Sequence, residues 1–324
     1  MRALRSRFAD LIALFVLVAA GLLALAAVAA NGGRYSLRLD LLCQFAPILA
    51  GAGAATALVG LVLPRWSRKP AVVLGLLTLV ASGLLIAPEL TRRSGPTAPA
   101  DAPYQLKIIQ FNALRTNENI DGIVDWLVAQ DPDIVTVEEA RHDLRDALVA
   151  RTGWHVAGAA GDLMIFSRAP RIRMVRPDLG PANPLHWVNA TYPSASGPYE
   201  VVAVHLDWPL GPSQGRQWAD LAGLIRQLQT QRMVLTGDFN ATPWSFVMRR
   251  GEQGLPLARR DRALATFPAK RNRDEPIDAP FALLPIDHVF AGPGWATVKV
   301  ERAASGLGSD HFPLIMTLAP AAQR

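Results

Sequence analysis

Three long apolar runs near the N-terminus constrain the fold most strongly, because soluble domains seldom contain such segments. Residues 11–30 carry only apolar side chains and glycine, and residues 41–63 and 71–87 are nearly as apolar. A helix that crosses a bilayer needs about 20 apolar residues, whereas runs of about 10–14 are typical of buried core helices. We therefore predict a membrane module over residues 1–88, with three transmembrane helices at about 11–30, 41–63 and 71–87.

The first run also has an interpretation as a signal peptide. Arg2, Arg5 and Arg7 precede it and small residues end it, which is the pattern of a cleaved leader. The run is long for that role and two further apolar runs follow it. Either interpretation places the C-terminal part of the chain on the same side of the membrane.

Basic residues around the runs predict the orientation. The positive-inside tendency puts the side richer in Lys and Arg in the cytoplasm. The N-terminus and the loop between the second and third runs each hold three basic residues, against two on each opposite segment. We expect a multi-pass protein of the cytoplasmic (inner) membrane, with a cytoplasmic N-terminus and a periplasmic or extracytoplasmic C-terminal domain.

The net positive charge of the chain comes from its N-terminal part. Residues 1–100 hold ten Lys and Arg and three Asp and Glu, a net of +7, whereas residues 101–324 have a net charge of −1. This distribution disfavours a broadly basic nucleic-acid-binding face on the C-terminal domain. Cys43 is the only cysteine, so no disulfide forms within the chain.

Beyond residue 88 the pattern changes from apolar runs to short strands and a few helices. Residues 89–103 are rich in Pro, Ala and small polar residues and indicate a linker. Apolar residues at helical spacing indicate helices near 120–128 and 218–228. Many strands with few helices between them predict an α/β domain over 104–320, with two packed sheets and helices outside. The expected strands are 106–111, 133–137, 162–167, 171–175, 186–192, 199–206, 233–237, 286–292, 296–302 and 313–319.

Several of these strands start or end at side chains that bind metals or carry protons. Any one such residue is ordinarily a solvated turn residue, but a series drawn only from Asn, Glu, Asp and His is hard to dismiss as chance, since functional residues favour loops on a rigid scaffold. The series is Asn112, Glu138, Glu139, His205, Asp238, Asn240, Asp287, Asp310 and His311.

Seven motifs in chain order resemble those of one family. They are LKIIQFN, PDIVTVEEA, MIFSRAP, VVAVHL, VLTGDFN, PIDHVF and GSDHFPL. Their order is similar to that of the endonuclease/exonuclease/phosphatase superfamily, the DNase-I-like fold, and the apolar runs before them resemble its membrane-anchored bacterial members. The resemblance implies a four-layer αββα sandwich with the site at one edge of the paired sheets.

The resemblance also implies roles for the polar series. The metal would be Mg²⁺, with Mn²⁺ as an alternative, held by Glu139, Asn112 and Asp310; Glu139 is preferred to Glu138, which stands where the family usually has Gln. His288 is treated as a neighbour of the site. The residues with catalytic roles would be His311, Asp238, Asn240, Asp287 and His205.

The chemistry of phosphoester hydrolysis fits these residue types. Mg²⁺ takes oxygen ligands and is usually held by one or two carboxylates, and a His paired with a carboxylate keeps a defined tautomer. Two assignments remain open: His311 activates water while Asp238 protonates the leaving oxygen, or Asp238 is the base and a protonated His311 stabilises phosphate. Strand alternation would place Asp238 and Asn240 on one face.

The leading hypothesis is a membrane-anchored, divalent-metal-dependent phosphoesterase of nuclease-like type. The arginine-rich residues 249–273 are interpreted either as a solvated loop or as an electrostatic guide for a polyanionic substrate. Trp208 and Trp244 would line the substrate pocket, anchor at the membrane interface or pack in the core. The alternatives are a phospholipid or headgroup phosphodiesterase and a catalytically silent binding domain. The expected partners are a phosphate-ester substrate and the bilayer, with no obligate protein partner evident.

Overall fold

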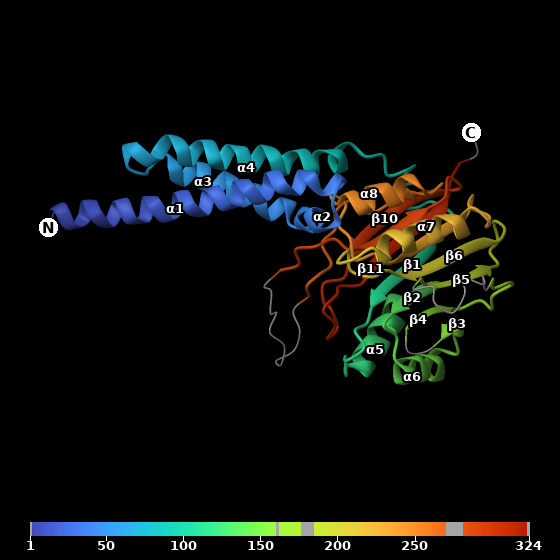
Figure 1. Cartoon of the computed structure of the whole chain (residues 1–324). Coiled ribbons are helices and arrows are strands. Elements are labelled where there is room, and N and C mark those ends of the chain that lie inside the picture. The colour runs from blue at the N-terminus through green and yellow to red at the C-terminus, as the bar shows by residue number, and fades with distance from the viewer. Residues whose placement is uncertain (1, 160–161, 176–184, 270–280, 323–324) are drawn as a thin grey trace. The chain divides into compact units, whose positions relative to one another are not determined.

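The computed structural model of the chain describes residues 2–159, 162–175, 185–269 and 281–322. The chain divides into two compact units. Residues 1–92 and 242–249 form the first, here called the helical unit, and residues 93–241 and 250–324 form the second, here called the sandwich unit. Figure 1 labels their elements.

The helical unit contains two helices that are long and apolar enough to cross a membrane, or three spans if a bent pair counts as one. The bent pair is α2 with α3, which meet at 61°. The second apolar run is therefore a broken helix, because Pro47 stands in the first turn of α3, where proline starts a helix but cannot continue one. The elements are α1 (Arg2–Ala30), η1 (Asn31–Arg34), α2 (Leu37–Cys43), α3 (Ala46–Gly60) and α4 (Arg65–Thr91).

Helices α3 and α4 approach each other closely through glycines. A methyl group on Gly75 would lie 2.5 Å from the backbone nitrogen of Ala57, and one on Gly53 would lie 2.7 Å from that of Leu79. Small residues at such crossings let two helix backbones pack directly, which is a common way to join helices in an apolar environment. Larger side chains at these two positions would separate the helices.

The sandwich unit consists of two β-sheets. The six-stranded sheet has the order β10-β11-β1-β2-β4-β3 and the five-stranded sheet has the order β5-β6-β7-β9-β8. This confirms the predicted α/β fold with paired sheets. The strands are β1 (Leu106–Asn112), β2 (Ile134–Glu138), β3 (His155–Ala159), β4 (Leu163–Ser167), β5 (His186–Tyr192), β6 (Tyr199–His205), β7 (Met233–Asp238), β8 (Ala258–Arg259), β9 (Asp287–Ala291), β10 (Trp295–Arg302) and β11 (Leu314–Pro320).

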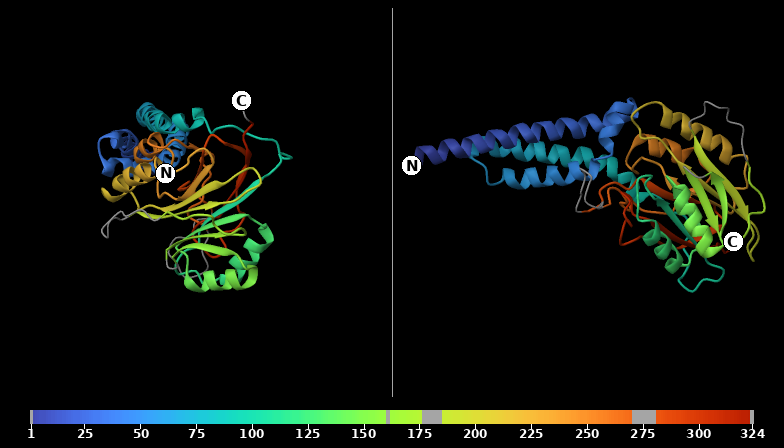
Figure 2. Two further views of the ribbon diagram at one scale, coloured as in Figure 1. Left: turned by 90° about the vertical axis from the view of Figure 1, so that its right-hand side faces the viewer. Right: turned by 90° about the horizontal axis from the view of Figure 1, so that it is seen from below.

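Alternation along the strands explains the layers. On β1, Ile108 belongs to the core between the sheets, whereas Ile109 packs under the helices α5 (Ile120–Gln130) and α6 (His142–Thr152). Adjacent strand residues point to opposite faces, so one run of apolar residues serves two cores. The second sheet is covered by α7 (Ser213–Ile225), and α8 (Phe246–Gln253) follows β7. Figure 2 shows the green α5 and α6 on the opposite side of the sheets from α7.

Some elements differ from the sequence predictions. Helix α6 and strand β3 were not predicted, because α6 buries only Leu144 and Leu148 and so has a weak apolar pattern. The expected strand at 171–175 is reduced to an isolated bridge between Arg173 and Thr191. Arg171, Ile172 and Arg173 are exposed, so this segment lacks the alternating buried positions of a strand in either sheet.

A buried ionic cluster lies behind strand β9. The Asp261 carboxylate accepts a hydrogen bond from Arg259 at 3.0 Å and another from the backbone of Val289 at 2.9 Å, and it lies 2.9 Å from His288 Nδ1. The side chains of Asp261, Arg259 and His288 are almost fully buried. Burial alone would raise the pKa of Asp261, but the neighbouring His288 and Arg259 lower it below its usual value.

The depressed pKa of Asp261 predicts acid sensitivity. Its ion pairs stabilise the fold above the pKa of an unfolded Asp, about 3.9, and this contribution is lost as the pH falls below that value. Asp261→Asn should cost about 1.5–3 kcal/mol of stability at neutral pH, because it weakens the charge-assisted hydrogen bond of Arg259, whose Nε still pairs with Glu252. Its loss of stability between pH 5 and 3 should be shallower than that of the wild type, as measured by denaturant unfolding in detergent followed by tryptophan fluorescence. The exposed Asp143→Asn is the matched control, and equal acid sensitivity of Asp261→Asn and wild type would contradict the assignment.

Candidate active site

The register of the strands brings the polar series to one edge. Asn112 pairs with Glu138 across the parallel strands β1 and β2, and His205 pairs with Asp238 across the parallel strands β6 and β7. Strand β9 runs antiparallel to β7, so its first residue, Asp287, pairs with Asp238. Carboxyl ends of parallel strands lie at the same edge of a sheet, which explains why residues far apart in sequence meet there.

A cleft of about 600 Å³ opens at this edge. It is lined by seven of the predicted site residues: Asn112, Glu139, His205, Asp238, Asn240, Asp310 and His311. Asp287 and Glu138 are fully buried and are absent from the lining. Glu139 and His311 therefore share one cavity.

His311 and Asp287 form a hydrogen-bonded pair. His311 Nδ1 lies 2.7 Å from Asp287 Oδ2, and the other oxygen of Asp287 accepts a hydrogen bond from Gln110 Nε2 at 2.7 Å. Burial alone would lower the pKa of His311, but the charges of Asp287 and Asp238 raise it to about 10. Burial would raise the pKa of Asp287, yet the charge and hydrogen bond of His311 keep it below its usual value. The charge of Asp287 thus favours the protonated form of His311, whose Nε2 lies on the side of Asp238.

Asp238 lies at the centre of the cleft. Its Oδ2 accepts a hydrogen bond from Asn112 Nδ2 at 3.1 Å and is 3.7 Å from the Nε2 atoms of both His205 and His311. Burial raises the pKa of Asp238 to about 6, although the charge of His311 acts in the opposite direction. A carboxylate with this pKa can exchange a proton near neutral pH, which suits a general base or acid.

Asn240 lies beyond the end of strand β7, in a turn, and not on the strand as the sequence predicted. Strand β7 ends at Asp238, and Asn240 adopts a left-handed backbone conformation with φ of 49°. Strand alternation therefore does not place the two residues on one face. The Asn240 backbone N–H donates to Asp238 Oδ1 at 2.9 Å, which closes a local turn. Its side-chain Nδ2 donates to the carbonyl of Leu206 at 2.8 Å, and its Oδ1 has no partner among the described residues.

Glu139 and Asn112 both line the cleft and contact each other. Asn112 Nδ2 donates to Glu139 Oε1 at 3.3 Å, and the backbone N–H of Arg115 donates to Glu139 Oε2 at 2.9 Å. Glu139 has a left-handed φ of 54°, which turns its side chain out of the strand direction. Glu138 instead accepts a hydrogen bond from Gln110 inside the fold, and burial, followed by the charge of Asp287, raises the pKa of Glu138 well above its usual value.

The donor set of the cleft fits a hard divalent cation. Carboxylate and carboxamide oxygens of Glu139, Asn112 and Asp310 are the ligand type that Mg²⁺ and Mn²⁺ accept. Asn240, whose Oδ1 has no hydrogen-bond partner among the described residues, lines the same cleft. Ligand atoms of Asp238, Asp287 and His311 also lie within 4.8 Å of one another. In that second group, however, His311 Nδ1 and Asp287 are already joined by a hydrogen bond.

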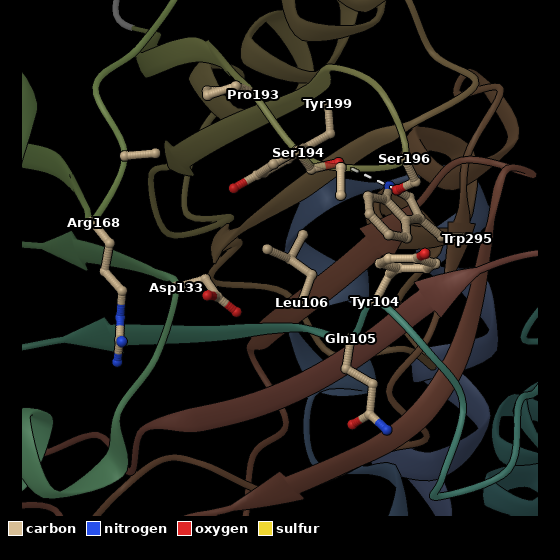
Figure 3. Close-up of a pocket in the computed structure, with 12 residues that line it drawn as sticks. Tyr104, Gln105, Leu106, Asp133, Arg168, Pro193, Ser194, Ser196, Tyr199 and Trp295 are labelled. Carbon is tan, nitrogen blue, oxygen red and sulfur yellow. Dashed lines mark hydrogen bonds between the residues drawn. The ribbon is translucent and has the colours of Figure 1, made fainter.

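A second cavity lies at the opposite ends of β1 and β2 (Figure 3). It measures about 290 Å³ and is lined by residues that include Tyr104, Asp133, Tyr199 and Trp295. Its lining has one acidic side chain and no histidine, so it lacks the groups needed for metal-assisted hydrolysis. The polar cleft is therefore the candidate active site.

The comparison with protein families agrees with the geometry of this cleft. The family model described as the Endonuclease/Exonuclease/phosphatase family matches residues 109–311, well over half of the chain. The chain belongs to this family. The matched residues run from β1 to His311 and so include all eight residues to which metal-binding or catalytic roles were assigned.

Several solved structures share the fold at low sequence identity. An endonuclease/exonuclease/phosphatase from Bacteroides vulgatus has a TM-score of 0.56 and 18% identity, and the alignment covers 67% of this chain and 99% of that one. The human Nocturnin catalytic domain with bound sulfate has a TM-score of 0.54 and 17% identity, covering 72% and 99%. D. rerio TDP2 with a single-strand DNA product has a TM-score of 0.55 and 13% identity, covering 66% and 99%. A search of curated proteins found no match.

Several residues of the cleft were missed in the sequence. Gln110, which links Glu138 to Asp287, was detectable as the only amide inside the apolar run LKIIQF. His186 also lines the cleft and pairs with Asp162, a partner that raises its pKa. No local signal distinguishes His186 from any other strand residue, because its partner is 24 positions away.

Proposed function

We propose that this protein is a membrane-anchored, divalent-metal-dependent phosphoesterase. The family it belongs to supports hydrolysis of phosphoester bonds. The observation that carries the finer proposal is the cleft itself, in which the His311–Asp287 pair and Asp238 share one cavity with Glu139 and Asn112. Acid–base groups beside an oxygen-rich cation site are what metal-assisted attack of water on phosphorus requires.

The roles follow from the geometry. Glu139, Asn112 and Asp310 would hold Mg²⁺ or Mn²⁺, which when bound neutralises the charge of the phosphoryl oxygens. Asp238 and His311 face each other at 3.7 Å, so one takes the proton of the attacking water while the other assists the leaving oxygen or the phosphate. Asp287 orients His311, and His205 and Asn240 position the phosphate and the water without adding negative charge.

Two arginines of the arginine-rich segment are not available to a polyanionic substrate. Arg259 and Arg260 are almost fully buried, and Arg260 donates hydrogen bonds to the carbonyls of Gly292 and Trp295 at 2.9 and 3.0 Å. The expectation that these arginines guide nucleic acid is therefore wrong for both, because they satisfy buried carbonyls and carboxylates instead. Lys270, Arg271 and Arg273 lie outside the described residues.

The rim of the cleft favours an amphiphilic substrate instead. Leu210 is 74% exposed and lines the cleft with Trp208, whose side chain is 38% exposed. The rings of Trp208 and Phe267 are 5.8 Å apart, and Phe267 is 5.0 Å from His311. Apolar groups that remain exposed beside a reactive site mark contact with apolar parts of a ligand. A phospholipid or another lipid phosphoester, presented at the bilayer to which the helical unit would anchor the enzyme, fits this rim best.

The proposal is tested with the full chain in detergent or nanodiscs with Mg²⁺. The substrate panel comprises phospholipids, a lipid phosphomonoester, single-stranded DNA, RNA and sugar phosphates, with EDTA and His311→Ala as controls. Metal-dependent hydrolysis of a lipid phosphoester is the expected result. Faster hydrolysis of DNA or RNA would restore the nuclease-like reading, and no metal-dependent hydrolysis of any substrate would favour a catalytically silent binding domain.

The exposed apolar residues of the rim predict how KM depends on the apolar part of the substrate. Leu210→Ser and Trp208→Ala should raise KM for a long-chain phosphoester by about 10-fold, since each lost apolar contact is worth about 1–3 kcal/mol. The same variants should leave the hydrolysis of a short water-soluble phosphoester nearly unchanged. Val128→Ser, which removes an exposed apolar side chain from α5, is the matched control. Equal KM changes for both substrates would count against an apolar substrate group.

The topology stays part of the proposal. The apolar helices α1 and α4 and the basic residues Arg65, Arg68 and Lys69 support a cytoplasmic N-terminus and an extracytoplasmic catalytic domain in the cytoplasmic membrane. Boundaries at 88 and 104 for the membrane module and the catalytic domain remain predictions. A C-terminal reporter fusion that is active only in the cytoplasm would reverse the orientation.

A further inference from the structure

A short segment after the catalytic motif belongs to the helical unit. Residues 242–249 follow Asn240 by one intervening residue, yet they form a compact unit with residues 1–92. The segment is largely apolar and buried: Trp244, Val247 and Met248 are each no more than 4% exposed. The chain therefore passes from the sandwich unit into the helical unit two residues after Asn240.

Asp40 holds the start of helix α8 in this segment. Its carboxylate is 1% exposed, and its two oxygens accept hydrogen bonds from the backbone N–H groups of Phe246 at 2.7 Å and Val247 at 2.8 Å. The first N–H groups of a helix have no partner within the helix, and a carboxylate there satisfies them and favours the positive end of the helix dipole. Here the cap comes from α2, about 200 residues earlier in the chain.

Two further residues complete the contact. The side-chain oxygen of Gln44 accepts a hydrogen bond from the backbone N–H of Thr242 at 2.9 Å, and its backbone carbonyl accepts one from Trp244 Nε1 at 3.0 Å. Arg249 donates to the carbonyl of Leu85 on α4 at 2.8 Å. Buried polar groups are costly unless paired, so this set of matched donors and acceptors specifies one placement of the segment.

We propose that Asp40 and Gln44 are positioning residues for the active site. Gln44 bonds the N–H of Thr242, two residues after Asn240, and Asn240 is held in a left-handed conformation in which its N–H bonds Asp238. Asn adopts this conformation more readily than most non-glycine residues, and hydrogen bonds on both sides of Asn240 fix it here. The bond of Gln44 acts on Asn240 through the chain itself, because only Ala241 separates Asn240 from Thr242. This inference rests on the proposed function for its catalytic consequence.

The test uses the full chain with substitutions at the contact. Asp40→Ala removes both acceptors for α8 and Asp40→Asn removes one. We expect kcat to fall about 10–100-fold in Asp40→Ala, and less in Asp40→Asn, because small displacements of catalytic groups have effects of this size. KM should change little, since the rim of the cleft is untouched. Asp10→Asn is the matched control, because Asp10 is an exposed carboxylate of the same unit that bonds only the indole of Trp66 among the contacts described.

Backbone hydrogen exchange separates this inference from the proposed function. In Asp40→Ala the amides of Phe246, Val247 and Asn240 should exchange faster than in the wild type and in Asp10→Asn, with no loss of the global fold. Unchanged exchange at Asn240 would overturn the positioning role whether or not a substrate is known. Unchanged kcat in both Asp40 variants of an enzyme that His311→Ala inactivates would overturn it as well, while leaving the proposed function intact.

Discussion

Replacing His311 with alanine should lower kcat/KM by about 10²–10⁴-fold, the usual contribution of a positioned acid or base. The reason is structural: His311 Nε2 is the group that faces Asp238 across the cleft, and its Nδ1 is fixed by Asp287 at 2.7 Å. Both possible assignments of the general base need this imidazole. The result should appear as a loss in kcat, measured by product release under saturating metal.

Two further variants test whether the loss of kcat in His311→Ala comes from the His311–Asp287 pair. Asp287→Asn keeps the shape of the side chain but not its charge, so it should impair His311 by a large fraction of the same effect. His142→Ala removes an exposed imidazole of α6 and should leave the rate unchanged. If His311→Ala kept most of its activity while folding normally, neither catalytic assignment would survive.

Replacing Glu139 with glutamine should raise the Mg²⁺ or Mn²⁺ concentration needed for half-maximal activity by at least about 10–100-fold, the range reported for weaker perturbations of metal sites. Glu139 is the carboxylate that lines the cleft beside Asn112, and the substitution removes its charge while keeping its size. Metal titration of activity and Mn²⁺ binding by calorimetry would both report the change.

The neighbouring glutamate supplies a sharp comparison. Glu138 is fully buried and bonds Gln110, so Glu138→Gln should leave metal affinity close to that of the wild type. Glu118→Gln, on the surface, controls for the loss of a charge. If Glu138→Gln rather than Glu139→Gln weakened metal binding, the assignment of the metal ligand would be wrong.

Much of the candidate site could be predicted because its residues mark strand ends. Asn112, Asp238 and Asp287 each stand at the boundary of an apolar strand, and such boundaries are visible in the local pattern. Their convergence follows from the pairing of β1 with β2, β6 with β7, and β7 with β9. The role of His186 could not be predicted, because it depends on Asp162, which approaches it only in the folded chain.

By itself, the sequence determined the apolar runs, the alternation that builds two sheets, and the ordered motifs of the Endonuclease/Exonuclease/phosphatase family, because these depend on the spacing of residues along the chain. Tertiary structure alone decided three things. It buried Arg259 and Arg260, which composition presents as a charged surface. It broke the second apolar run into α2 and α3. It also placed residues 242–249 in the helical unit, where Asp40 accepts a hydrogen bond from the backbone N–H of Phe246. The first and third outcomes depend on hydrogen-bond partners that are distant in sequence. The second depends on how the helix that Pro47 begins packs in the fold. The spacing of residues along the chain encodes neither the distant partners nor this packing.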